Sequence, residues 1–170
     1  MIRVRVFKAH EWATYKDLRL RALADSPDAF GSTFASEAQR PDSEWSSRLA
    51  PSDGSARNLP LVAEFDGQPI GLAWGRIEDS DPELAYLYQV WVMPDYRGLG
   101  AGQMLVEAVI AWAEAQQARQ LELAVTRGDS PATRLYARLG FEPTGQIDPV
   151  RPEADLLEQR MRLTLNPLAA

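Results

Sequence analysis

The residues best suited to chemistry form a glycine-rich segment at positions 97–102, with the sequence RGLGAG. It lies between an apolar, β-prone run and an amphipathic run of helical period. Glycines at a helix start keep side chains out of the first turn, so a ligand can approach the backbone amides. Those amides lack partners within the helix and lie at the positive end of its dipole. The segment therefore predicts a pyrophosphate-binding loop.

Two familiar nucleotide loops do not match this segment. A Walker loop requires Lys followed by Ser or Thr directly after its last glycine, whereas Gly102 is followed by Gln103 and Met104. A dinucleotide fingerprint counted from Gly98 and Gly100 would require a glycine at position 103. What the chain does contain is the pattern Arg-x-x-Gly-x-Gly, at residues 97, 100 and 102.

A second segment follows about twenty residues later. The β-prone run at 121–126 is broken by RGDSP, and a short helical stretch comes next. Ser130 is a suitable N-cap, Pro131 suits the first helical position, and Gly140 is a suitable helix stop. Local physics thus predicts a strand, a cap and a short helix that ends in Gly-Phe.

Together, the two segments resemble the coenzyme A loop and the second signature of the GNAT superfamily of acetyl-coenzyme A-dependent N-acetyltransferases. The second resemblance depends on Ala132, Leu135-Tyr136 and Gly140-Phe141. It extends well from about residue 59 to 141, and the stretch 27–33 is similar to one bacterial subgroup. The residues that the resemblance assigns to acetyl-CoA are Val90, Trp91, Val92, Arg97, Gly98, Leu99, Gly100, Ala101, Gly102, Gln103 and Asp129.

The resemblance implies how these residues act. Backbone amides of 98–103 would hold the pyrophosphate, and the strand edge at 90–92 would pair with the amides of the pantetheine arm. Position 129 departs from the family, which usually has Asn there. An ionised Asp129 cannot donate an amide N–H, so a structural role suits it better than a cofactor contact.

Tyr136 is the predicted catalytic residue, because the resemblance places it opposite the cofactor sulfur. Attack of an amine on a thioester expels a thiolate whose conjugate acid has a pKa of about 8.5 if it behaves as an ordinary thiol. A phenol can protonate that leaving group.

The general base stays open. The position that carries Glu in some family members is Ala124 here. The alternatives are Glu122, Glu37, Asp81, Glu83 and a water chain lined by Tyr88 and Gln89.

The implied function is transfer of an acetyl group from acetyl-CoA to a primary amine of a small molecule or peptide, by direct attack with no covalent enzyme intermediate. A non-catalytic acyl-CoA sensor or interaction module on the same fold is the alternative. The segments without strong signatures (30–45, 79–83 and 145–157) are expected to form the acceptor pocket.

The elements that must position these residues follow from periodicity. We expect one domain over 1–170, of α/β class: a GNAT-like sandwich with a mixed, mostly antiparallel sheet flanked by helices. A polar loop is expected at 51–58, a hairpin turn at 66–68 and a solvated hairpin loop around Asp79, Asp81 and Glu83. Expected strands are 2–7, 59–65, 69–77, 84–93, 121–126 and 158–165, and expected helices are 11–24, 42–49 (capped by Asp42 or Ser43) and 100–117.

Composition narrows the classes of function. The net charge is −6, and the 18 basic residues are scattered, which argues against a nucleic-acid partner. There is no cysteine and one histidine, so a disulfide framework, a metal site and a Ser-His-Asp triad are not expected. No apolar run is long enough for a membrane span, and we expect no signal peptide because the first residues alternate apolar and basic side chains. We expect a cytoplasmic protein, monomeric or homodimeric, with no metal and no membrane partner.

Overall fold

The computed structural model describes residues 1–50 and 57–167. The strands are β1 (Ile2–Val6), β2 (Asn58–Phe65), β3 (Gln68–Glu78), β4 (Asp81–Val92), β5 (Gln120–Thr126), β6 (Glu142–Pro149) and β7 (Leu157–Thr164). The helices are α1 (Trp12–Asp25), α2 (Phe34–Ala38), α3 (Asp42–Leu49), α4 (Ala101–Ala115) and α5 (Pro131–Arg138), with 3₁₀ turns η1 (Ala9–Glu11), η2 (Pro27–Ala29) and η4 (Pro94–Tyr96).

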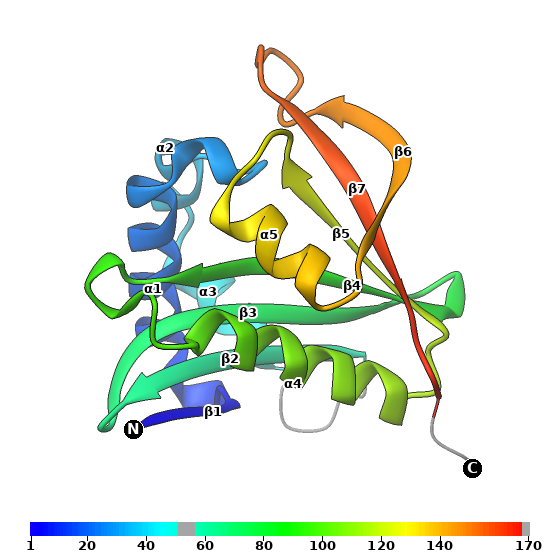
Figure 1. Cartoon of the computed structure of the whole chain (residues 1–170). Helices are drawn as coiled ribbons and strands as arrows, with labels where there is room; N and C mark the ends of the chain where they lie inside the picture. Colours follow the sequence, from blue (N-terminus) through cyan, green and yellow to red (C-terminus); the bar gives the residue numbers. More distant parts are fainter. Residues whose placement is uncertain (51–56, 168–170) are drawn as a thin grey trace.

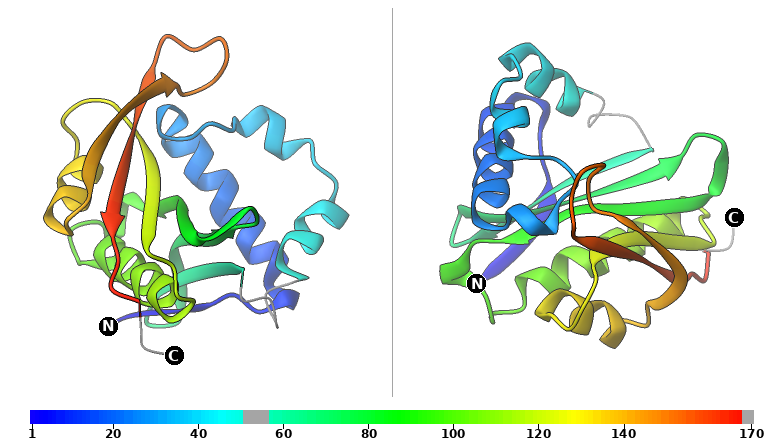
Figure 2. Two further views of the ribbon diagram at one scale, coloured as in Figure 1. Left: turned by 90° about the vertical axis from the view of Figure 1, so that its right-hand side faces the viewer. Right: turned by 90° about the horizontal axis from the view of Figure 1, so that it is seen from above.

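One sheet, ordered β1-β2-β3-β4-β5-β7-β6, forms the middle layer. Helices α4 and α5 cover one face, and α1, α2 and α3 lie on the other (Figures 1 and 2). All neighbouring strands run antiparallel except β4 and β5. The parallel pairing extends only from Leu84–Gln120 to Tyr86–Glu122. Beyond it the two strands separate, which leaves an opening in the centre of the sheet (Figure 1).

Two apolar cores hold the layers together. The larger core packs α4 and α5 against the sheet, with Leu105, Val106 and Val109 fully buried. The smaller core lies under α1 and α3 and is built around Tyr15 and Trp45. Burial of such side chains contributes about 1.5–3 kcal/mol each, so the helices on both faces are firmly held.

Strand β4 faces both cores because a bulge interrupts its alternation. Ala85 and Leu87 lie in the larger core, and Val90 packs against the same core. Regular alternation would place Val90 on the opposite face, because it is three residues after Leu87. The register with β3 shifts by one residue in this region, and Gln89 has a φ of 62°. An extra residue of this kind moves all later side chains to the opposite face. The indole of Trp91 thereby enters the smaller core.

The predicted fold class is confirmed, and so are the predicted strands and the helices around 11–24, 42–49 and 100–117. One helix was missed, and two expectations were wrong in detail. Helix α2 was not predicted, because a five-residue helix is too short to show a period. The N-cap of α3 is Pro41, with Asp42 inside the helix. Asp81 belongs to β4, so the solvated loop at 79–83 is shorter than expected. Of the polar loop expected at 51–58, residues 51–56 lie outside the described residues, and Asn58 already belongs to β2.

Candidate active site

A cavity of about 1530 Å³ occupies the opening between β4 and β5. At one end it is lined by the glycine-rich segment and α5, and at the other by polar side chains of β3, β4, β5 and β7. Its rim includes the loop after α1, which bridges the opening. The Oγ1 of Thr126 on β5 donates to the carbonyl of Asp28 at 2.6 Å, and Nη1 of Arg151 donates to the carbonyl of Phe30 at 2.8 Å.

The glycine-rich segment presents free amides to the cavity. Within the described chain, no acceptor is found for the N–H groups of residues 98–103, and the first bond of this turn runs from the amide of Met104 to the carbonyl of Gly100. Gly98 and Gly100 have φ values of 80° and 92°. A side chain would strain both positions, although a Cβ there would meet nothing within 4 Å. The backbone shape, rather than crowding, therefore requires glycine.

Arg97 is held at the edge of this segment. Its Nε donates to the carbonyl of Val92 at 2.9 Å, and its Nη2 pairs with Asp25 at 2.7 Å. The Nε1 of Trp91 donates to the same Asp25 carboxylate at 2.9 Å. The bonds from Trp91, Ser26 and Arg97 lower the pKa of Asp25. The end of α1 is thus tied to the strand and loop that line the cavity.

The strand edge at 90–92 is unpaired on the side of β5 and lines the cavity. Beyond Tyr86, β4 has no ladder partner on the side of β5. An unpaired strand edge offers a row of N–H and C=O groups to an extended ligand. At the bulge, the side-chain oxygen of Gln89 accepts a 2.8 Å bond from the hydroxyl of Tyr15 on α1. This contact fixes the strand where it separates from β5.

Tyr136 lies on α5 between the larger core and the cavity. The residue is 7% exposed, and its ring packs edge-to-face against Phe141 at 5.8 Å. Ser130 caps α5 and shares a capping box with Thr133, which orients the helix as the sequence predicts. Among the described residues the Tyr136 hydroxyl has no hydrogen-bond partner, and burial raises its pKa well above the usual range.

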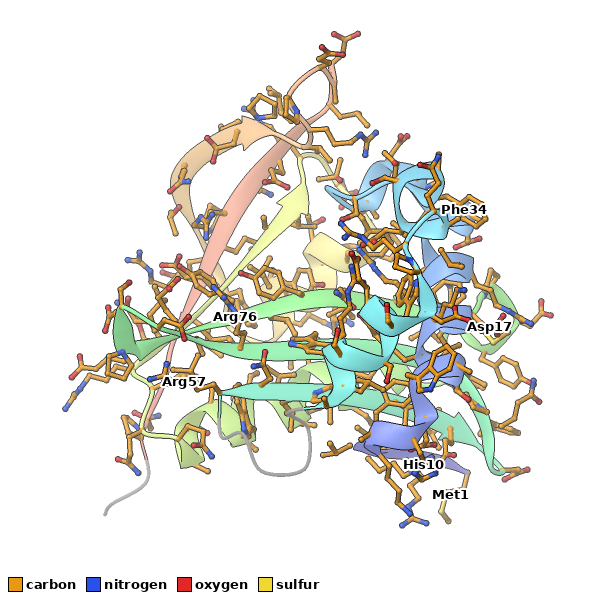
Figure 3. All side chains as sticks on the ribbon, turned by 180° about the vertical axis from the view of Figure 1, so that it is seen from behind. Met1, His10, Asp17, Phe34, Arg57 and Arg76 are labelled. Atoms are coloured by element: carbon orange, nitrogen blue, oxygen red, sulfur yellow. The ribbon has the colours of Figure 1, made fainter. Side chains whose placement is uncertain are left out.

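The far end of the cavity has a polar floor. Glu122 on β5 is buried and is paired with both Arg160, at 3.3 Å, and Arg162, at 2.6 Å, on β7. Tyr86 and Tyr88 stack near it with centroids 5.8 Å apart. Figure 3 views the molecule from behind and labels Arg76, which lies on the part of the sheet that α1 does not cover.

The candidates for the general base differ in whether they line the cavity and in whether their oxygens are already bonded. Both oxygens of Glu122 are engaged by arginines, and Tyr88 and Gln89 line the cavity. Glu37 is buried outside the cavity, in ion pairs with Arg40 and Arg48. Asp81 and Glu83 do not line it either.

The segments expected to form the acceptor pocket reach the cavity only in part. Residues 30–32 and Val150 line the cavity, whereas no residue of the segment 79–83 does so. The β3–β4 turn lies at the end of the strands, away from the opening. Asp129 lines the cavity, but its carboxylate is exposed and pairs with Arg134 at 2.8 Å. This pairing agrees with a structural role for Asp129.

The cavity residues that sequence reasoning missed include Arg19, Arg160 and Glu158. Burial raises the pKa of Glu158, nearby Asp148 adds to the rise, and Arg160 opposes it. No hydrogen bond or ion pair joins the Glu158 side chain to another described residue. The alternation of residues 157–164 places Glu158 and Arg160 on one face of the strand. Which face of the sheet this is follows only from the pairing of β7 with β5. Neither the residue type of Arg19 nor its position in the helical pattern predicts that it lines a cavity.

Two absences concern only the described residues. None of their helices combines the length and apolar character needed to cross a bilayer. They also contain no group of three or more His, Cys, Asp or Glu side chains placed to hold a metal ion.

The fold is that of acetyltransferases of known structure. An acetyltransferase of the GNAT family from Streptococcus pneumoniae superposes with a TM-score of 0.82 at 21% identity, over 98% of this chain and all of that chain. An acetyltransferase from Salmonella typhimurium, solved with acetyl-CoA, gives 0.79 at 20% identity over 100% and 97% of the two chains. A family model described as "Acetyltransferase (GNAT) family" matches residues 20–141. The chain belongs to the GNAT acetyltransferase family.

Relatives in sequence carry several different activities. An L-methionine sulfoximine/L-methionine sulfone acetyltransferase from Pseudomonas paraeruginosa is 32% identical over 75% of this chain and 77% of its own length. A mycothiol acetyltransferase from Thermobispora bispora is 28% identical over 82% of this chain and 46% of its own. An uncharacterized N-acetyltransferase from Mycobacterium bovis is 36% identical over 59% and 63%. The chain thus spans about two fifths to two thirds of several of the relatives that it matches.

Proposed function

We propose that this protein transfers the acetyl group of acetyl-CoA to a primary amine of a small molecule or peptide. One observation carries the proposal: a single cavity is lined by the glycine-rich segment with its free amides, by the unpaired edge of β4 and by Tyr136. This sequence of groups suits a pyrophosphate, a peptide-like arm and a thioester in that order. When bound, acetyl-CoA supplies an activated acyl group.

The residues of the chain have distinct roles in this reaction. The amine nitrogen attacks the thioester carbonyl directly, a C–N bond forms, and the C–S bond breaks without a covalent enzyme intermediate. Tyr136 donates its phenolic proton to the departing sulfur. In support, the Tyr136 hydroxyl has no competing partner among the described residues, and its raised pKa keeps it protonated at neutral pH.

Glu158 is the carboxylate that we assign as the proton acceptor for the amine. It lines the cavity, has no bonded partner among the described residues and has a raised pKa, which makes it a stronger base than an exposed glutamate. Glu122 is less suitable, because Arg160 and Arg162 already engage its oxygens. Names of relatives support a small acceptor: one is named for L-methionine sulfoximine and L-methionine sulfone.

Two measurements test the proposal. Isothermal titration should show binding of acetyl-CoA and none of NAD; binding of NAD alone would contradict the assignment. Thiol release from acetyl-CoA is then followed across a panel of amines, amino acids, polyamines and peptide N-termini. Release well above hydrolysis with any amine supports an enzyme. Binding without release with any amine would favour a non-catalytic acyl-CoA sensor.

A further inference from the structure

Arg19 is a buried cation that the fold does not neutralise. It lies in the middle of α1, is 4% exposed, and lines the cavity. Its Nε and Nη1 are buried and have no hydrogen-bond partner among the described residues. A guanidinium stays charged in proteins, and an unpaired buried charge is costly. The folded chain therefore retains an unfavourable group at this position, which requires an explanation.

The neighbours of Arg19 do not satisfy it. The guanidinium carbon lies 4.7 Å from the centre of the Phe30 ring, a cation–π contact that leaves the in-plane N–H donors unused. Burial lowers the pKa of Arg19, whereas Tyr15 and the carboxylate of Glu37 raise it. That carboxylate is already bonded to Arg40 and Arg48, so it has little to offer a third guanidinium.

Three carboxylates of the cavity are engaged elsewhere, and the others form no ion pair with Arg19. Asp25 is bonded to Trp91 and Arg97, and Asp129 is paired with Arg134. Glu122 is held by two arginines of β7. No ion pair joins Arg19 to any carboxylate in the described part of the chain. None of the described carboxylates therefore serves as the counter-ion of Arg19, which leaves its donors available to the anion of a ligand.

Helix α1 places Arg19 beside the open edge of β4. One turn before it, Tyr15 bonds to Gln89 at the bulge, and after it Asp25 bonds to the indole of Trp91. The intervening part of α1 therefore lies along residues 89–91 of β4, where the strand separates from β5. This is the edge to which we assigned the acyl-bearing arm, at the end away from the pyrophosphate loop.

We propose that Arg19 binds a carboxylate of the acceptor, which is an α-amino acid or a similarly small amine with a carboxylate close to its nitrogen. This inference rests on the proposed acetyl transfer. The planar guanidinium matches a carboxylate with two parallel hydrogen bonds, which a single ammonium cannot do. The ring of Phe30 fixes the plane of the Arg19 guanidinium. Because carboxylate and amine are close together in such an acceptor, binding of the carboxylate directs the amine toward the bulge at Gln89.

Matched acceptors test this proposal. For several amino acids, kcat/KM is compared for the free acid, its carboxamide and the amine that lacks the carboxyl group. We expect the acid to be preferred by about 10- to 100-fold, as for hydrogen bonds to a charged group. Arg19→Met should remove that preference, and Arg19→Lys should retain only part of it. The control is Arg21→Met: Arg21 is exposed and pairs with Asp17, which Figure 3 shows on the outer side of α1.

Several outcomes would overturn the proposal. Equal use of acid, carboxamide and decarboxylated amine by the unchanged protein would do so without any variant. An Arg19→Met protein that loses activity toward all three equally, or that melts well below the unchanged protein, would show a structural role. Replacing an unpaired buried charge by an apolar side chain is expected to hold or raise the melting temperature.

A separate readout distinguishes this proposal from the proposed function. If no amine releases thiol, acetyl transfer is contradicted, and amino-acid binding is then measured alone by thermal shift with and without acetyl-CoA. Stabilisation by free amino acids but not by their carboxamides, lost in Arg19→Met, supports the carboxylate site even then. Absence of any such stabilisation overturns it.

Discussion

At the scale of single residues, Tyr136 combines a packed ring with an unengaged hydroxyl. Tyr136→Phe removes only that oxygen and keeps the edge contact with Phe141. We expect kcat to fall by about 10²- to 10⁴-fold, the usual contribution of a positioned acid. The KM for acetyl-CoA and the melting temperature should change little, because no hydrogen bond within the described fold is lost. Steady-state kinetics on an accepted amine would show this; nearly full turnover would mean that Tyr136 only packs.

Glu158 predicts a dependence on pH. A carboxylic acid with a raised pKa is protonated, and so inactive as a base, over a wider acidic range than an ordinary glutamate. The kcat/KM of the unchanged protein should therefore rise with pH through that raised pKa. Glu158→Gln should lower kcat/KM by about 10²-fold or more and abolish the acidic limb. A variant with the same acidic limb would assign that limb to another group.

At the scale of elements, the turn into α4 depends on its backbone conformation. Gly100→Val forces a β-branched residue to a φ of 92°, which distorts the turn and displaces the free amides. We expect the Kd for acetyl-CoA, measured by titration calorimetry, to rise at least about 10-fold, the loss of roughly one hydrogen bond to a charged group. Gly67→Val is the matched control: its φ is 84°, nothing lies near its Cβ, and it is in the β2–β3 turn away from the cavity. Equal loss of affinity in both variants would contradict a role specific to this turn.

The ion pair between Arg5 and Glu11, at the junction of β1, η1 and β2, predicts that the free energy of unfolding depends on pH. Hydrogen bonds from Arg5 lower the pKa of Glu11 from 4.5 to about 2. A carboxylate with a lowered pKa contributes stability above its unfolded pKa, and this contribution is lost as pH falls toward 2. Glu11→Gln should cost about 1.5 kcal/mol at pH 7, the low end for a bond to a charged group because the pair is partly exposed. Urea unfolding should show that the difference in the free energy of unfolding between the two proteins shrinks between pH 5 and pH 2. A difference that stays constant with pH would show that the titration of Glu11 does not affect stability.

At the scale of the whole molecule, the sheet consists of two parts joined through three parallel residue pairs. A ligand that spans the opening would link β4 to α4 and β5. We expect acetyl-CoA at about 100 times its Kd to add about 2.7 kcal/mol to the free energy of unfolding. Hydrogen exchange should slow at residues 90–92 and 98–103 and stay unchanged in β2. Protection confined to other regions would place the ligand elsewhere.

The sequence predicted what local patterns can encode. The glycine-rich turn, the Ser130 cap and the alternating strands each have a signature within about ten residues, and the structure contains them. The rest depends on contacts far apart in the chain. The cavity position of Arg19 requires α1 to lie along β4, and Glu158 reaches the same space only because β7 pairs with β5. Neither follows from residue type or spacing.

The bulge at Gln89 has a consequence for how such a site can arise or be lost. Residues on either side of it are out of phase, so no substitution can move Trp91 and Val90 to each other's face, whereas removal of one residue would exchange them. The indole would then leave Asp25, and that carboxylate would lose one of its donors. In evolutionary terms, this stretch of β4 is sensitive to insertions and deletions more than to point changes. A single-codon deletion here would redraw the wall of the cavity while leaving every remaining amino acid in place.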